Sequence, residues 1–192
     1  VLYRPEDSLV INEIMYNGPA SGSSFIEIYN RNVNAAFNIS GYRLEGVDYT
    51  FPNASVIPGN GYLVLVSDRA GFAANYGASI VVFDQYTGNL DNGGERLKLV
   101  KPGATPEQDQ IIDEVRYDED APWPWEADGF GPSLQLIDPS QDNWTVGNWG
   151  ASATNALVKA TPKAQNSILG TVAAFPKLYI NEVLAQNVSG TA

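Results

Sequence analysis

The sequence predicts an all-β fold, a β-sandwich of about nine short strands with one short helix. Short segments rich in Val, Ile, Leu and Tyr recur along the 192-residue chain. Clusters of Gly, Pro, Asn and Asp separate them at a spacing of roughly 8–12 residues, which is typical of sandwiches. Only residues 68–76 resemble a helix, because Asp68 is a suitable N-cap, Phe72 and Tyr76 share one face, and Gly77 follows.

The strands are expected in a regular order after a lead-in of residues 1–7. They cover residues 9–16, 25–30, 42–45, 48–51, 62–67, 79–83, 95–100, 110–117 and 133–137. Segments 42–45 and 48–51 form a hairpin that turns at Gly46. Segment 9–16 has apolar residues on both faces, which predicts a strand that is covered on two sides.

Two later strands show alternating patterns. In segment 95–100, Leu97 and Leu99 alternate with basic residues, so the leucines are expected to face the core. In segment 110–117 we expect four residues on one face: Ile111, Asp113, Val115 and Tyr117. Further along, Trp144 and Trp149 are expected to anchor an irregular segment onto the sheets.

The composition is that of a globular domain, with 44% hydrophobic and 17% charged residues. A net charge of −11 argues against nucleic-acid binding, which requires clustered Lys and Arg. The chain has no His and no Cys, so the usual general base, disulfides and thiolate metal sites are absent. No apolar run reaches the ~20 residues of a membrane helix, so we expect no membrane insertion.

The opening strand has a second occurrence near the other end of the chain. Residues 9–17 and 178–187 share Ile-Asn-Glu, then apolar positions, then Asn. We therefore expect a domain at 8–166, a linker at 167–176, and the first strand of a truncated second copy at 177–192. The strand at 178–185 is expected to be disordered, or to pair or exchange with another copy of the chain.

Glu13 and Glu27 lie on neighbouring predicted strands and form a candidate catalytic pair. Two carboxylates roughly 5–10 Å apart can hydrolyse glycosides. In the alternative interpretation, Asn12 and Glu13 bridge backbone groups at a strand edge. The second Ile-Asn-Glu carries the same residue types, and every copy of a repeated scaffold needs its structural residues. The structural interpretation is therefore favoured over a hydrolase.

An acidic cluster lies in one loop, and its members are Asp118, Glu119, Asp120, Glu126 and Asp128. Such loops can bind Ca²⁺, which takes 6–8 oxygen ligands. The spacing matches no known calcium motif, so a solvated loop is favoured and no cofactor is expected.

The segments so far described resemble the lamin tail domain family in order and spacing. The similar stretches are Ile11-Asn-Glu-Ile14, Phe25-Ile-Glu-Ile-Tyr-Asn30, Ser40-Gly-Tyr-Arg-Leu44, Tyr49-Thr-Phe-Pro52, Ile57 to Asp68, Asn92 to Leu99, Asp113-Glu-Val-Arg-Tyr117, Trp123-Pro124, Asp128-Gly129, Ser133 to Pro139, and Thr161 to Asn166 as the closing segment. The resemblance implies an immunoglobulin-like β-sandwich without catalysis. It also implies the bacterial extracellular type, since no coiled-coil rod or basic nuclear signal is present.

Trp123 and Trp125 are the candidate ligand-binding residues. The Trp-Pro-Trp sequence can present an aromatic platform to a sugar ring or a peptide. Trp123 falls on the family's Trp-Pro position and is expected in the core, so Trp125 is the better candidate for exposure.

The resulting functional expectation is a non-catalytic binding, attachment or spacer module of a large secreted or cell-surface bacterial protein. Its partner would be a protein or a cell-surface polysaccharide. A carbohydrate-binding module that uses Trp125, with or without calcium, is the alternative. A hydrolase that uses Glu13 and Glu27 is the least favoured interpretation.

Overall fold

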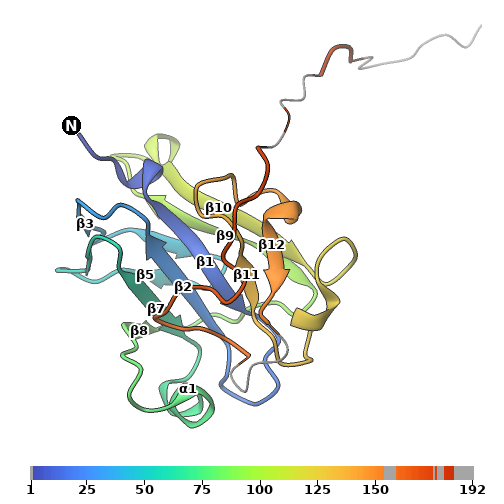
Figure 1. Ribbon diagram of the computed structural model, residues 1–192. Helices are drawn as coiled ribbons and strands as arrows, with labels where there is room; N and C mark the ends of the chain where they lie inside the picture. Colours follow the sequence, from blue (N-terminus) through green and yellow to red (C-terminus); the bar gives the residue numbers. More distant parts are fainter. Residues whose placement is uncertain (1, 154–158, 175, 177–179, 184–192) are drawn as a thin grey trace, which may run out of the picture.

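The computed structural model describes residues 2–153, 159–174, 176 and 180–183. Its strands form a six-stranded sheet, a four-stranded sheet and a two-stranded ribbon. Figure 1 shows how the strands and the helix are arranged. The predicted immunoglobulin-like β-sandwich with one helix is confirmed.

The larger sheet has the strand order β12-β11-β1-β2-β7-β8. Its strands are β1 (Leu9–Met15), β2 (Phe25–Asn30), β7 (Tyr62–Val66), β8 (Asp84–Gln85), β11 (Leu134–Leu136) and β12 (Trp149–Ala151). Neighbours are antiparallel except β7 and β8. The first strand therefore lies inside the sheet, where Glu13 pairs with Glu27 on one side and with Gln135 on the other.

The smaller sheet has four antiparallel strands in the order β10-β9-β4-β5. They are β4 (Arg43–Glu45), β5 (Tyr49–Thr50), β9 (Gly94–Lys101) and β10 (Gln110–Asp118). The predicted hairpin of β4 and β5 is confirmed, and Gly46 at its turn has a φ of 105°, which favours glycine. The separate ribbon pairs β3 (Phe37–Asn38) with β6 (Val56–Ile57).

The helix α1 (Arg69–Tyr76) is where the sequence predicts it. The Asp68 carboxylate caps it by accepting hydrogen bonds from the backbone N–H groups of Ala70 and Gly71. Phe72 is buried against Phe25, so the helix covers part of the outer face of the larger sheet. Four 3₁₀ helices complete the described elements: η1 (Pro5–Asp7), η2 (Pro106–Gln108), η3 (Trp125–Ala127) and η4 (Val146–Asn148).

The main core lies between the two sheets, where Ile11, Ile28, Leu44, Leu97 and Leu99 are fully buried. A smaller cluster lies on the outer face of the larger sheet, and it consists of Met15, Phe25, Val64, Val66, Phe72 and Ala160. All seven residues of β1 are consequently buried, which confirms the strand covered on two sides.

Two predicted details are wrong. Residues 79–83 form no strand, because the chain joins the edge of the sheet only at β8. In β10 the register shifts between Ile111 and Asp113, which is a β-bulge. The bulge turns Ile112 into the core and leaves Ile111 45% exposed, so Ile111 does not share the inner face. The added strands β3, β6 and β12 have only two or three residues, too few for a sequence pattern.

Residues 159–170 include the family-like stretch 161–166, and the whole range is called the closing segment from here on. It crosses the outer face of the larger sheet in front of β1 and β2 (Figure 1). The next described residues, 171–174, lead away from the body. Residues 180–183 have no regular secondary structure and are exposed, and the rest of the predicted strand 178–185 lies outside the described residues. In the described part, no helix has the length and apolar character needed to cross a membrane.

Candidate functional site

The carboxylates of Glu13 and Glu27 lie side by side on β1 and β2, as the sequence predicts, but both are completely buried. They sit under the closing segment, between its irregular backbone and the outer face of the sheet. The expected strand-edge position is wrong, because β1 is an interior strand.

Glu13 accepts four hydrogen bonds. They come from the Ser133 hydroxyl at 2.5 Å, the Gln135 side-chain amide at 2.9 Å, and the Thr161 backbone N–H and hydroxyl at 2.8 and 3.1 Å. Two of these donors belong to the closing segment. Glu13 therefore connects β1 to β11 and to the closing segment, both of which are far from it in the sequence.

Glu27 accepts hydrogen bonds from the Asn12 side-chain amide at 2.9 Å and from the Lys163 backbone N–H at 2.6 Å. Burial raises the pKa of Glu13, although its hydrogen bonds oppose this effect. Burial also raises the pKa of Glu27 well above its usual value, and the neighbouring Glu13 carboxylate raises it further. The pair serves as a hydrogen-bonding anchor for the closing segment.

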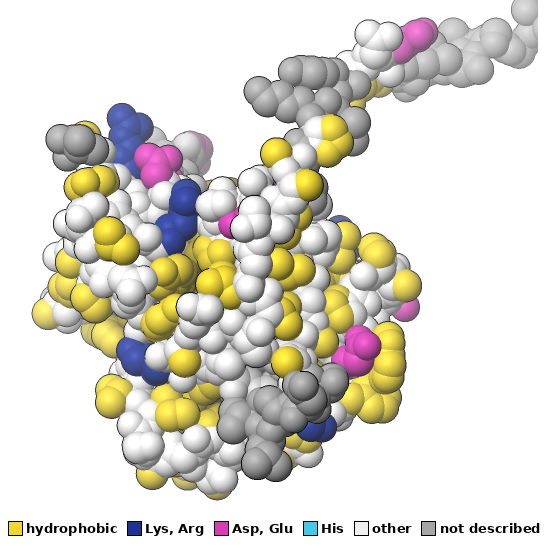
Figure 2. Space-filling view, in the orientation of Figure 1, with side chains coloured by type: hydrophobic (Ala, Val, Ile, Leu, Met, Phe, Trp, Pro, Cys, Tyr) yellow, Lys and Arg dark blue, Asp and Glu magenta, His cyan; other side chains and the backbone are white. Residues whose placement is uncertain are grey.

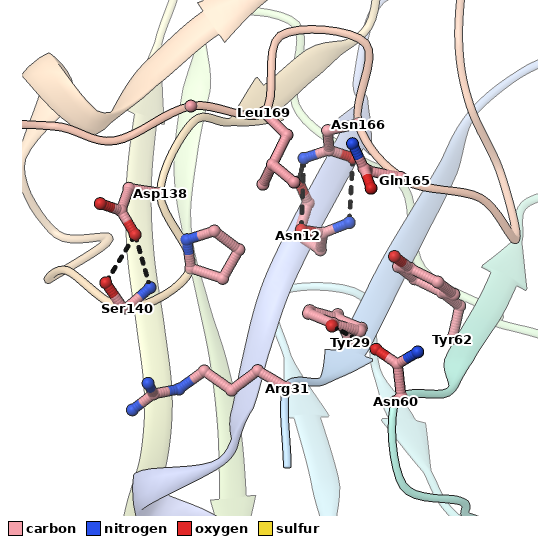
Figure 3. A pocket seen from close by; sticks show the side chains of 12 residues that line it. Asn12, Tyr29, Arg31, Asn60, Tyr62, Asp138, Ser140, Gln165, Asn166 and Leu169 are labelled. Carbon is pink, nitrogen blue, oxygen red and sulfur yellow. Dashed lines mark hydrogen bonds between the residues drawn. The ribbon is translucent and has the colours of Figure 1, made fainter. Parts of the chain in front are cut away.

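A pocket with a volume of about 590 Å³ lies beside this anchor. Figure 3 shows Tyr29 and Tyr62 on one side of it and Asp138 and Ser140 on the other. The closing segment contributes Gln165, Asn166 and Leu169. Neither Glu13 nor Glu27 lines the pocket.

The aromatic wall of the pocket comes from two neighbouring strands. Tyr29 of β2 and Tyr62 of β7 are paired in register, and their rings stack with centroids 4.5 Å apart and an interplanar angle of 16°. The Tyr29 hydroxyl donates a hydrogen bond to Asn60 Oδ1 at 2.7 Å. Burial raises the pKa of Tyr62 to about 12, so its hydroxyl stays protonated at neutral pH.

Opposite the tyrosines, the Asp138 carboxylate is held by Ser140 of its own loop and by Val172 from a distant part of the chain. One oxygen accepts from the backbone N–H and hydroxyl of Ser140 at 3.0 and 2.6 Å, and the other accepts from the Val172 N–H at 3.1 Å. The Ser140 hydrogen bonds lower the pKa of Asp138, and the positive charge of Arg31 contributes. Asp138 is therefore ionised near neutral pH, with at least one hydrogen bond on each oxygen.

Trp125 is exposed, as expected, and forms a T-shaped pair with Phe130 at a centroid distance of 5.1 Å. Each of the two residues is 61% exposed, so they make an aromatic protrusion in the loop before β11. Trp123 is half-buried and packs against Trp149 and the main core. The two predicted ligand-binding tryptophans therefore lie in different environments.

The remaining tryptophans also differ from each other. Trp149 is buried on β12, and its indole N–H donates to the Asn143 carbonyl at 2.7 Å, so it anchors this segment as expected. Trp144 is 44% exposed and stacks against the guanidinium of Arg96, 5.0 Å from the ring centroid. The sequence predicts that Trp144 packs on the sheets. In the structure it instead contacts Arg96 at the surface.

The acidic loop keeps its members apart. Asp128 accepts from the Asn17 side-chain amide at 2.7 Å, and Asp118 accepts from the Asp120 backbone N–H at 3.1 Å. The described residues contain no group of three or more His, Cys, Asp or Glu that could hold a metal ion.

Sequence reasoning did not single out Tyr29, Tyr62, Arg31 or Gln165. The pairing of β2 with β7 places the two tyrosines together, and both strands are predicted from the sequence. Nothing in the sequence pattern brings residues 138–140 or 165–170 to the same place, because both segments are irregular.

The fold is that of an immunoglobulin-like domain, and comparison with protein families agrees. The family model described as Lamin Tail Domain matches residues 4–119, which run from η1 to the end of β10. The chain belongs to the lamin tail domain family. Searches of curated proteins and of solved structures found no match.

Proposed function

We propose that this chain is a non-catalytic module that serves binding, attachment or spacing in a large secreted or cell-surface bacterial protein. Membership of the lamin tail domain family supports this proposal, since that family is non-enzymatic. The observation that carries it is the complete burial of Glu13 and Glu27, whose oxygens fasten the closing segment. A glycoside hydrolase needs such carboxylates at the scissile bond.

The contact surface for a partner would include the exposed Trp125–Phe130 pair. Exposed aromatic side chains are frequent anchors in protein interfaces and in sugar recognition. The net charge of −11 supports a protein or polysaccharide partner over a nucleic acid. Figure 2 shows isolated Lys and Arg side chains on one face, without a continuous basic patch.

Carbohydrate binding is the second candidate function, and the pocket with the stacked tyrosines favours it. Trp125 supports it less, because its ring and that of Phe130 meet at 80° and form no common plane.

Retention of the 192-residue chain on bacterial envelopes and on a panel of envelope and plant polysaccharides, with and without Ca²⁺, tests the proposal. We expect retention on at least one of these surfaces, reduced by Trp125→Ala and unchanged by Trp144→Ala. The second variant is a matched control, because it also removes a partly exposed indole but at another site. Release of new reducing ends from a polysaccharide, or retention on no surface, would contradict the proposal.

A further inference from the structure

We propose that the pocket of about 590 Å³ between β2, β7 and the closing segment binds a saccharide unit that carries a carboxylate group. This inference rests on the proposed function, since it assigns a ligand class to a non-catalytic binding domain. It places the ligand site away from Trp125, which does not line this pocket.

The size and the lining of the pocket indicate a small polar ligand. Its volume falls within the roughly 300–1,000 Å³ that is usual for small-molecule sites. Apolar side chains such as Leu169 alternate with hydroxyl, amide and charged groups such as Ser140 and Arg31. A sugar ring has this mixed character, with C–H faces and hydroxyl edges.

The stacked rings of Tyr29 and Tyr62 provide a preorganised aromatic element of the kind that sugar rings contact. Stacking at 4.5 Å fixes each ring against the other, and the Tyr29 hydroxyl is fixed by Asn60. Little side-chain entropy remains to be lost when a ligand binds there. Both hydroxyls are polar groups at the pocket wall, where they can meet sugar hydroxyls.

Arg31 supplies the charge selectivity. Five basic side chains of the described part form ion pairs: Arg4, Arg43, Arg69, Arg96 and Lys98. Arg31 forms none with any described residue, although it lines the pocket. The nearby Asp138 carboxylate already accepts hydrogen bonds from Ser140 and Val172 on both oxygens. An exposed guanidinium of this kind is suited to bind a ligand carboxylate, in two parallel hydrogen bonds.

Two amide groups add further donors. The Gln165 side chain is exposed at the pocket and makes no hydrogen bond within the described residues. Asn60 accepts the Tyr29 hydrogen bond through Oδ1, which leaves its NH₂ group to donate. Arg31, Gln165 and Asn60 thus offer free donors at the pocket, and a carboxylated sugar is rich in acceptors.

Isothermal titration calorimetry with three ligand types tests the inference. The first type is acidic oligosaccharides, namely oligogalacturonate, alginate oligomers and hyaluronan oligomers. The second is the methyl ester of oligogalacturonate, which keeps the rings and loses the charge. The third is acetate, which has a carboxylate and no ring. We expect at least one acidic oligosaccharide to bind, and the methyl ester and acetate to bind at least about tenfold more weakly.

Variants then locate the site. Arg31→Gln should raise Kd by about tenfold or more, because a charge-assisted hydrogen bond is lost. Gln165→Ala should raise it by roughly three- to tenfold, as expected for a neutral hydrogen bond. Arg116→Gln is the matched control, since Arg116 is exposed on β10 outside the pocket, and should leave Kd unchanged. Chemical shift changes should involve Asn60, Gln165 and Asn166.

Four results would overturn the inference: no acidic oligosaccharide binds, the methyl ester binds equally well, acetate binds equally well, or Arg31→Gln binds as the wild type does. Failure of the proposed function remains distinguishable. If the chain is retained on a polymer or an envelope and Arg31→Gln has no effect, this inference is wrong and the proposed function stands. If the chain neither binds an oligosaccharide nor is retained on any surface, both are wrong.

Discussion

The side chains of Asn12 and Asn166, 154 residues apart in sequence, hydrogen-bond to each other in both directions at 3.0 and 3.2 Å. Asn166 also donates to the backbone carbonyls of Asn12 and Leu136. Both amides are buried. They connect β1, β11 and the closing segment at one point, beside the carboxylates of Glu13 and Glu27.

Asn166→Ala should lower the free energy of unfolding by about 1–3 kcal/mol, because it removes hydrogen-bond partners of the buried Asn12 side chain and of the Asn12 and Leu136 backbone carbonyls. Urea denaturation followed by tryptophan fluorescence measures this change. The neighbouring Gln165→Ala is the control, since that side chain is exposed, and should change stability by less than about 0.5 kcal/mol. Equal effects of the two substitutions would show that the Asn12–Asn166 contact does not stabilise the fold.

Glu13→Gln should also destabilise the domain, by about 1–3 kcal/mol. A glutamine amide replaces one acceptor oxygen with a donor, while Ser133, Gln135 and Thr161 all donate to this position. The backbone amide signal of Thr161 should shift in a ¹H–¹⁵N spectrum. Glu119→Gln, at an exposed position, is the matched control. An unchanged urea midpoint for Glu13→Gln would contradict an anchoring role.

Asp113 should make stability depend on pH. Its carboxylate accepts from the Ile11 N–H at 2.7 Å and from the Asn143 side-chain amide at 2.6 Å, but burial raises its pKa from 3.8 to about 7. The folded protein therefore keeps a proton that the unfolded chain loses above pH 3.8. The contribution of this proton to the free energy of unfolding is fully present below pH 3.8. It declines as the pH rises to about 7 and is absent at higher pH.

Asp113→Asn should remove that part of the pH dependence. The difference in unfolding free energy between pH 4 and pH 8 should become smaller than in the wild type, by at most about 4 kcal/mol. Urea unfolding of both proteins at several pH values provides the comparison. If the two curves of stability against pH run parallel, the Asp113 carboxyl does not titrate as proposed.

Gly71→Ala should destabilise the domain even though alanine favours helices. A Cβ on Gly71 would lie 2.6 Å from the Gly22 Cα, so backbone would have to move. At an ordinary helix position the same change would stabilise by about 0.5–1 kcal/mol. Ala74→Gly, the reverse substitution at an exposed site of α1, should cost about 1 kcal/mol through propensity alone. A higher melting temperature for Gly71→Ala would show that the loop at Gly22 moves freely.

The sequence correctly predicts the strands whose apolar residues follow a regular pattern. Strands β1, β2, β7 and β9 lie within about two residues of their predicted bounds, because their apolar residues alternate or form short runs. The bulge in β10 was not predictable, since one unpaired residue leaves the composition of the strand unchanged. The predicted packing of Trp144 on the sheets is wrong, because an arginine can cover an indole as well as a hydrophobic core can.

The sequence predicts the two carboxylates of the candidate site but not their partners. Glu13 and Glu27 stood out as carboxylates within strands of apolar residues, and the repeat of Ile-Asn-Glu favoured a structural role. Their partners in the closing segment are mainly backbone N–H groups, which carry no sequence signature. The closing segment also lines the pocket, so the pocket could not be predicted without the tertiary structure.

The interior position of β1 has a consequence for folding during synthesis. Gln135, which pairs with Glu13, is made 122 residues later, so one edge of β1 stays open while the ribosome adds them. At about 5–20 residues per second, this takes roughly 6–24 s. Ile180-Asn181-Glu182, the second occurrence of the β1 sequence, emerges after β11. The order of synthesis therefore gives β11 the first opportunity to fill that edge, before the similar sequence is available to compete for it.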